Sequence, residues 1–211
     1  MTGKIKLVHS GGNAVSIAVP TSNPSSSEVE FKLPGSDGSA NQVLKTDGSG
    51  NLSFAADSGG KFASYAIICD QKSLGTDGGT FTSGDWRTRD LNTELADADG
   101  IVSISSNQFT LQAGNYLIEA NAPGYKVNRH IIKLRQTSGT AADIVFGTAE
   151  YAKDSYQSYN RSFLSTRVTI SEATTYEIQH RSEATMSTYG FGIAADFSTE
   201  IYTLVKIFKE S

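Results

Sequence analysis

Apolar and polar residues alternate along most of this chain, and a period of two predicts strands with one buried face. The alternation first occurs in three short runs, at residues 4–9, 15–20 and 28–33. Residues 91–99 carry Asn, Thr and three acids and are interpreted as a loop or a single turn. The pattern predicts further strands at residues 62–70, 86–91, 101–104, 108–111, 115–122, 126–135, 144–149, 162–170, 175–181, 189–194 and 201–208. Many short strands separated by turn signals predict an all-β sandwich, jelly roll or barrel.

Some segments also indicate where they lie in the fold. Residues 201–208 are apolar on both faces, which predicts a central strand. Residues 126–135 place His130 and two aliphatic side chains on one face and mostly charged side chains on the other, which predicts a half-buried strand. Gly114, soon after the run that ends at Leu111, is interpreted as a hairpin signal.

Residues 34–54 contain two turn segments rich in Gly and Asp, at residues 35–38 and 46–51, around one short apolar step at residues 42–45. Asp-Gly pairs supply the positive φ angles of tight reversals, so this segment folds back on itself. It has too few apolar side chains to be stable alone. We therefore expect it to lie against other copies of the same chain.

A hinge-like segment at residues 57–60 divides the chain into two predicted domains. Residues 1–60 are interpreted as a small β-rich attachment and trimerisation segment, because they are too polar for a core of their own. Residues 61–211 are interpreted as the head domain.

Composition narrows the classes of partner. The formal net charge is −4 and the basic residues are spread out, so we expect no nucleic-acid partner. No apolar run approaches ~18 residues, so we expect no membrane partner. The N-terminus has no signal-peptide pattern. Cys69 is the single cysteine, which excludes an intramolecular disulfide, and its apolar surroundings predict a buried thiol.

The residues that carry chemistry form no catalytic or metal-binding motif. The three histidines show no metal-ligand spacing, and there is no nucleophile elbow or phosphate loop. The acidic segments at residues 77–79 and 97–100 are explained by turn chemistry. We predict no enzyme, no metal and no cofactor. His130 and His180 lie on predicted strands, can meet across the sheet, and are interpreted as core or interface residues.

Several motifs resemble a known family. Phe109, Gly114 and Tyr116 form a Phe-Gly-Tyr step, and residues 120–125 follow it. Together with the segments at residues 86–92, 176–180 and 200–209, this step resembles a module of phage virion proteins. The module is similar to the jelly roll of the complement globular-head and tumour-necrosis-factor superfamily. The resemblance covers residues 61–211 and implies a jelly-roll head in a homotrimer around a threefold axis.

Residues 34–54 resemble a connector at the N-terminal ends of fibre proteins of tailed phages. The two resemblances together imply a phage virion structural protein, assembled in the host cytoplasm and located in the virion. It would be a trimeric fibre or appendage that attaches to other virion proteins through residues 1–60. Its head would bind host surface structures, either a glycan or a protein.

Two groups of residues are assigned to these roles. Tyrosines in a polar loop suit recognition because each offers a large contact area at a small entropic cost. They would also suit packing between subunits. The receptor-binding candidates are Tyr151, Tyr156, Tyr159 and Arg161. The subunit-interface candidates are Tyr116, His130, His180 and Tyr202.

Other functions stay open at this point. The same chain would suit a capsid decoration protein or head fibre that stabilises the shell. It would also suit an accessory carbohydrate-binding, lectin-like module.

Overall fold

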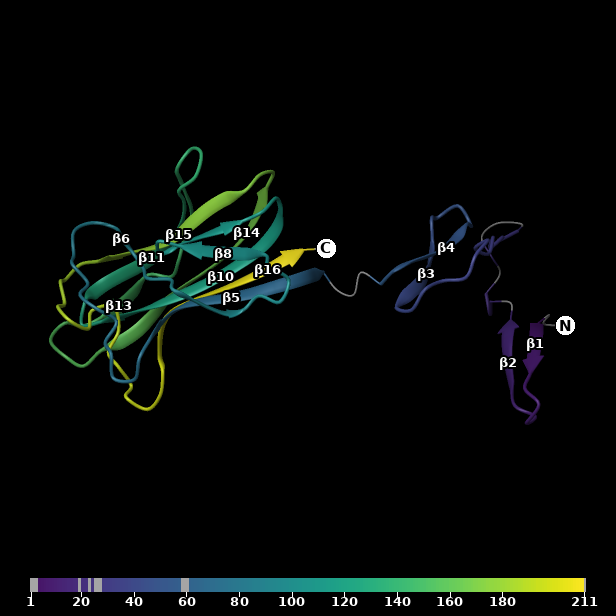
Figure 1. Cartoon of the computed structure of the whole chain (residues 1–211), viewed down its shortest axis with the longest axis horizontal. Helices are drawn as coiled ribbons and strands as arrows, with labels where there is room; N and C mark the ends of the chain where they lie inside the picture. The colour runs from purple at the N-terminus through teal and green to yellow at the C-terminus, as the bar shows by residue number, and fades with distance from the viewer. Residues whose placement is uncertain (1–3, 19, 23, 25–27, 58–60, 211) are drawn as a thin grey trace. The chain divides into compact units, whose positions relative to one another are not determined.

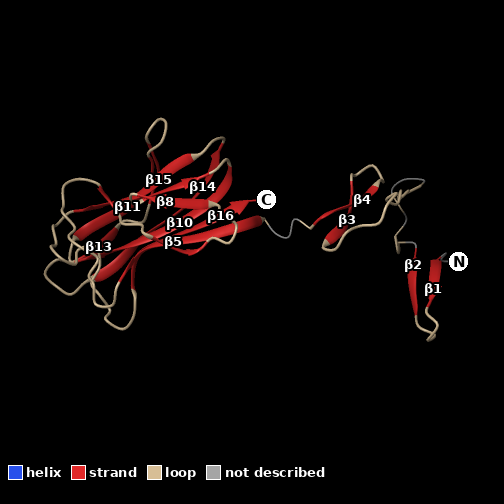
Figure 2. Cartoon of the chain, in the orientation of Figure 1, coloured by secondary structure: helices blue, strands red, loops and turns tan. Residues whose placement is uncertain are grey.

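A computed structural model describes residues 4–18, 20–22, 24, 28–57 and 61–210. The described residues form strands, turns and loops (Figure 2), and none belongs to a helix that would be long and apolar enough to cross a membrane. The chain separates into two compact units, residues 1–57 and residues 58–211. The hinge predicted at residues 57–60 lies, apart from Asp57, outside the described residues.

The N-terminal unit contains two antiparallel hairpins (Figure 1). The first pairs β1 (Lys4–Val8) with β2 (Ala14–Ala18), and the second pairs β3 (Gln42–Thr46) with β4 (Leu52–Ala56). The turn of the second hairpin is closed by Asp47, whose Oδ1 accepts a hydrogen bond of 2.7 Å from the amide of Ser49. The strand predicted at residues 28–33 is wrong, since its only ladder contact is an isolated bridge. The short apolar step at residues 42–45 lies in β3, because β4 supplies the strand with which it pairs.

No described side chain of the N-terminal unit is buried. Ile5 and Ile17 face each other across the first hairpin and are 64% and 68% exposed. Phe31 and Leu33 are 63% and 77% exposed. Each hairpin is held by backbone hydrogen bonds and turn contacts, and two-stranded hairpins alone are marginally stable in water.

The head unit contains two antiparallel sheets. The five-stranded sheet has the order β14 (Tyr159–Ile170), β10 (Gly114–Tyr125), β16 (Glu200–Glu210), β5 (Phe62–Lys72) and β7 (Thr93–Ala96). The seven-stranded sheet has the order β12 (Ala142–Phe146), β11 (Asn128–Gln136), β15 (Thr174–Ser182), β9 (Gln108–Leu111) and β8 (Val102–Ser105), with β13 (Glu150–Ala152) paired to β11 and β6 (Arg87–Thr88) paired to β15.

Successive strands pass back and forth between the two sheets. Strand β9 lies in the seven-stranded sheet, β10 in the five-stranded sheet, and β11 in the seven-stranded sheet again. Strands β14, β15 and β16 repeat the same alternation. This order and the exclusively antiparallel pairing within the head confirm the predicted all-β jelly-roll sandwich.

The main core lies between the two sheets, where each strand presents every second residue. Strand β16 is central in its sheet, between β10 and β5 (Figure 1), as its two apolar faces predict. The buried core side chains include Ile68, Phe109, Leu111, Tyr116, Ile118, Ile132, Leu134, Tyr176, Ile178, Val205 and Ile207. The half-buried strand predicted at residues 126–135 is confirmed, because His130, Ile132 and Leu134 are buried whereas Arg129 is exposed.

Four local predictions are wrong for reasons of tertiary pairing. Residues 108–111 and 114–125 do not form a hairpin, because β9 and β10 belong to different sheets. Residues 91–99 contain strand β7, which pairs with β5. Residues 189–191 form a turn and residues 192–194 are irregular, and the run at residues 86–91 shortens to the two residues of β6. A period of two shows that a segment can pair, but the available partner decides whether it does.

Candidate functional site

The predicted receptor-binding tyrosines are exposed, but each has different neighbours. Tyr151 lies on β13, opposite Arg129 of β11, and is 53% exposed. Tyr156 lies in a turn and is 67% exposed, with the ammonium of Lys153 4.7 Å from its ring centroid. Tyr159 begins β14, and its ring centroid lies 6.4 Å from that of Tyr125.

Arg161, the fourth receptor candidate, binds the head itself. Its Nη1 donates hydrogen bonds of 2.6 Å to both Asn121 Oδ1 and the carbonyl of Tyr202, and its Nη2 donates to the carbonyl of Ile201 at 3.2 Å. These bonds connect β14 to β10 and β16 across the five-stranded sheet. Structural contacts therefore occupy most of what this guanidinium can donate.

The four predicted interface residues lie inside a single chain. Tyr116, His130, His180 and Tyr202 are at most 3% exposed. The Tyr116 hydroxyl donates to the carbonyl of Gln112 at 3.0 Å, and the Tyr202 hydroxyl donates to the carbonyl of Thr76 at 2.8 Å. Burial within one chain accounts for all four side chains without a partner subunit.

A groove of about 760 Å³ opens on the outer face of the seven-stranded sheet. It lies on this face because Arg129 and Ile131 alternate along β11 with His130 and Ile132, which point into the core. The register places Tyr151 beside Arg129 and places Arg181 of β15 beside Ile131. The lining residues are Ser83, Gly84, Arg129, His130, Ile131, Ala149, Glu150, Tyr151, Arg181, Ser182 and Glu183.

The two carboxylates of this groove already have partners. Glu150 accepts hydrogen bonds from Thr148 Oγ1 at 2.9 Å and from Asn160 Nδ2 at 3.4 Å. Glu183 Oε2 accepts from the amide of Arg129 at 3.3 Å and lies 3.7 Å from the Nε of the same residue. The exposed Arg181 side chain has no hydrogen bond or ion pair with any other residue that the structure describes. The groove therefore contains one guanidinium available to a ligand.

A chain of hydrogen bonds runs from the exposed edge of the groove into the interior. Asn160 Nδ2 donates to the carbonyl of Tyr151 at 3.1 Å, which turns Asn160 Oδ1 toward His130 Nε2 at 2.7 Å. Because Oδ1 only accepts, His130 carries its proton on Nε2. His130 Nδ1 then accepts from His180 Nε2 at 2.9 Å. The two histidines meet across the sheet, as predicted, and form part of the interior.

Burial holds both histidines neutral. Desolvation lowers the pKa of His130 and lowers that of His180 well below its usual value, and the nearby Arg89 guanidinium acts in the same direction. The fully buried ring of His180 packs against Phe81 at a centroid distance of 4.6 Å. Its Nδ1 has no hydrogen-bond partner among the described residues. These features are typical of structural histidines.

A second polar network surrounds the fully buried Arg89, which precedes Asp90 in the segment after β6. Arg89 Nε donates to Thr203 Oγ1 and its Nη2 to the carbonyl of Phe191, both at 2.8 Å, and the guanidinium lies 4.1 Å from the Phe191 ring centroid. Burial lowers the pKa of Arg89 to about 10, although it stays charged at neutral pH. The network connects β6 and its following segment to β16 and to the loop that precedes β16.

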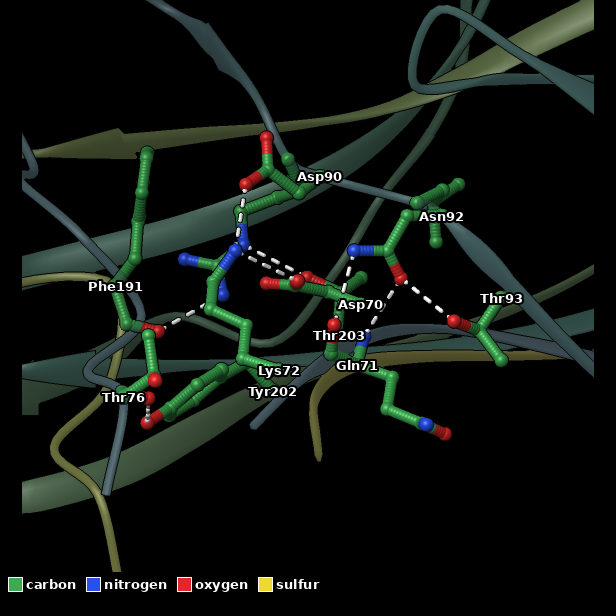
Figure 3. A network of polar contacts seen from close by, with 12 residues as sticks. Asp70, Gln71, Lys72, Thr76, Asp90, Asn92, Thr93, Phe191, Tyr202 and Thr203 are labelled. Carbon is green, nitrogen blue, oxygen red and sulfur yellow. Dashed lines mark hydrogen bonds and ion pairs between the residues drawn. The ribbon is translucent and has the colours of Figure 1, made fainter. Parts of the chain in front are cut away.

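The neighbouring Lys72 joins two acids, as Figure 3 shows. Its Nζ lies 3.0 Å from Asp70 Oδ1 and 2.9 Å from Asp90 Oδ2. Burial raises the pKa of Asp70, against the opposing effect of Lys72. Lys72 pairs with both acids, and Arg89 and Asp70 are buried, whereas the Asp90 side chain is 44% exposed. We interpret the network as a structural clamp.

Cys69 is fully buried in β5, which confirms the predicted buried thiol. Burial, followed by the charge of Asp70, raises the pKa of this thiol to about 11. No group of three or more His, Cys, Asp or Glu side chains within the described ranges is arranged to hold a metal ion. The groove residues Arg129 and Arg181 were not singled out from the sequence, although both occupy outward positions of predicted strands.

Comparisons with known proteins find likeness in backbone structure only. No family model matches this chain, and no curated protein matches its sequence. Murine APRIL matches at 10% identity over 69% of this chain and 98% of its own, with a TM-score of 0.48. The globular domain of zebrafish complement 1qA matches at 14% identity over 69% and 96%, with a TM-score of 0.46. The vertex protein P5 of PRD1 matches at 10% identity over 72% and 100%, with a TM-score of 0.48.

Proposed function

We propose that this chain is a structural protein of a phage virion, a homotrimeric appendage whose N-terminal unit attaches to the particle and whose head binds host surface structures. The virion assignment depends on the resemblance of residues 34–54 to fibre connectors and of the head to a virion module. The observation that carries the assembly is the N-terminal unit, in which no described side chain is buried. Several apolar residues exposed to this extent in one small unit are typical of a surface that packs against a partner.

The head offers a second surface for self-association, on the outer face of its five-stranded sheet. Tyr65, Phe163 and Phe62 are 54%, 51% and 41% exposed. Phe62 lies 5.4 Å from Phe208, which pairs across the strands with Tyr65. A sheet face of this composition supports packing against another protein, and copies of the same chain supply it most directly.

Light scattering coupled to gel filtration of the full chain tests the assembly. We expect three times the mass of one chain at micromolar concentration. The double variant Tyr65→Ser with Phe163→Ser is expected to lower that mass, whereas Tyr156→Ser, which changes an exposed tyrosine elsewhere, is expected to leave it unchanged. A wild-type chain that stays monomeric would refute the trimer.

Gold labelling of the protein on intact particles tests the virion location. We expect label at the tail or at a projecting appendage. Label spread over the capsid faces would favour a decoration protein, and particles without label would contradict a virion role.

A further inference from the structure

The groove between β13, β11 and β15 has the features of a small, selective binding site. Its volume of about 760 Å³ lies within the usual range for sites that take small ligands, ~300–1,000 Å³. Its floor is the half-buried Ile131, and its sides carry an exposed aromatic ring and exposed guanidinium groups. An apolar floor with a few polar groups is typical of ligand pockets.

The charges favour an anion with a single charge. Arg181 is unpaired among the described residues, whereas Glu150 and Glu183 accept hydrogen bonds from neighbouring groups. Guanidinium groups bind carboxylates through two parallel hydrogen bonds. The two acids in the groove and the net charge of −4 disfavour polyanions such as nucleic acids or long acidic polymers.

The strand pairing favours a compact ring over an extended peptide. At the groove floor, β11 pairs with β13 on one side and with β15 on the other, so β11 offers no free edge to which a peptide could add as a strand. A ligand must therefore lie on side chains. The hydroxyl of the exposed Tyr151 has no hydrogen bond to any residue that the structure describes, and its ring presents a flat apolar surface, which suits the carbon–hydrogen face of a sugar ring.

The register sets the span of this site. Tyr151 and Arg181 lie on strands to either side of β11 and are offset by two residues along it. With ~4.8 Å between strands and ~3.4 Å per residue, their Cα atoms are roughly 12 Å apart. Two linked sugar rings cover such a span, with one ring against Tyr151 and the carboxylate of the other near Arg181.

We propose that this groove binds a carboxylate-bearing sugar, with Arg181 pairing its carboxylate and Tyr151 packing against a ring. The proposal rests on the host-binding role proposed above and names the chemical class of the ligand. The head would accordingly recognise acidic glycans, such as those that contain uronic or sialic acids.

The test is titration of the full chain, by calorimetry and by NMR saturation transfer, with a panel of carboxylated sugars and matched neutral forms. The panel contains disaccharides of galacturonic, glucuronic and mannuronic acid, sialyl-lactose, the methyl ester of each, and an Asp-Asp dipeptide. We expect at least one acid to bind about tenfold or more tightly than its own ester, because the ester loses the charged hydrogen bonds. If no acid exceeds its ester, or if the dipeptide binds as well as the best sugar, the proposal is overturned.

Variants locate the site. Arg181→Gln is expected to weaken binding of the best sugar about tenfold or more, and Arg181→Lys to weaken it by less, because the charge stays but the paired geometry is lost. Tyr151→Ala is expected to weaken binding several-fold, and Tyr151→Phe to leave it unchanged. Tyr156→Ala and Arg167→Gln, outside the groove, are the matched controls. Binding that survives Arg181→Gln and Tyr151→Ala would place the ligand elsewhere.

Adsorption of the labelled wild-type chain and of Arg181→Gln to envelope preparations from a panel of bacteria separates the two proposals. If both adsorb equally, the host-binding role stands and the acidic-sugar groove is refuted. If the wild type adsorbs to no envelope while an acidic sugar still binds the groove, the groove stands and the host-binding role is refuted.

Discussion

Replacing Arg89 with Met tests whether the buried clamp stabilises the head. Methionine keeps most of the length of the side chain and fills much of its space, so the change mainly removes the charge and the donors. The variant loses two hydrogen bonds of 2.8 Å, to Thr203 Oγ1 and to the Phe191 carbonyl, and a longer one of 3.5 Å to the Pro123 carbonyl. It also loses the contact between the guanidinium and the Phe191 ring.

The expected loss follows from these contacts. Each hydrogen bond to a charged group contributes about 1.5–3 kcal/mol, and buried acceptors left without partners add a penalty. The opposing effect is desolvation of the guanidinium, which Met does not incur. We expect the free energy of unfolding to fall by about 3 kcal/mol, within the range seen when one partner of a buried charge network is removed.

Urea unfolding of the full chain, followed by tryptophan fluorescence, measures this loss. A change of about 3 kcal/mol lowers the midpoint by about 1–2 M for an m-value near 2 kcal/mol/M. Arg87→Met is the matched control, because the half-buried Arg87 donates one hydrogen bond, 3.2 Å long, to the exposed carbonyl of Thr82. Loss of this bond is expected to lower the free energy of unfolding by less than about 1 kcal/mol. If Arg89→Met is as stable as the wild type or more stable, desolvation outweighs the network and our interpretation of a clamp is wrong.

Three further predictions concern other buried groups. His130 and His180 have lowered pKa values in the folded head, so the unfolded chain binds protons first as pH falls. Stability is therefore lost below about pH 6.5, by up to about 1.4 kcal/mol per pH unit for each histidine. Urea midpoints measured from pH 8 to pH 5 test this, and a flat profile would contradict it. Cys69 is expected not to react with a thiol reagent at pH 8 until urea unfolds the head, and rapid labelling of the native protein would show that the thiol is accessible. Arg161→Ala is expected to lower stability by about 2 kcal/mol through loss of its bonds to β10 and β16, while Tyr156→Ala changes it by less than about 0.5 kcal/mol in the same thermal-unfolding experiment.

The alternation of apolar and polar residues predicted many of the strands of the head, because a strand with one buried face requires an apolar residue at every second position. The run at residues 108–111 matches β9, and β11 is half-buried, as predicted. The central position of β16 followed from its two apolar faces. The prediction of a hairpin after Leu111 was wrong, because a turn that contains Gly has the same local sequence whether the chain returns within one sheet or crosses to the other sheet.

The candidate site was less accessible to sequence reasoning. Tyr151 was selected as an exposed recognition residue, and its exposure agrees with that choice. Arg161 was selected for the same reason but is bonded to the head. Arg181 was not selected, although its outward position on β15 was implied by the alternation. The local sequence does not distinguish an arginine whose guanidinium is bonded within the head from an arginine whose guanidinium is not, because the bonding partners lie on other strands.

The sequence by itself determined the β class, the half-buried character of β11 and the burial of Cys69, and it predicted the division into a polar N-terminal unit and a larger head. These properties follow from the side-chain period and from the number of apolar residues in each segment, which are local. The tertiary structure decided which strands pair and in which register. It thereby joined His130 to His180, enclosed Arg89, and brought Tyr151 beside Arg129 and Arg181 beside Ile131 in one groove. Pairing of this kind is non-local, because each contact depends on residues far apart in the chain that only the folded sheets bring together.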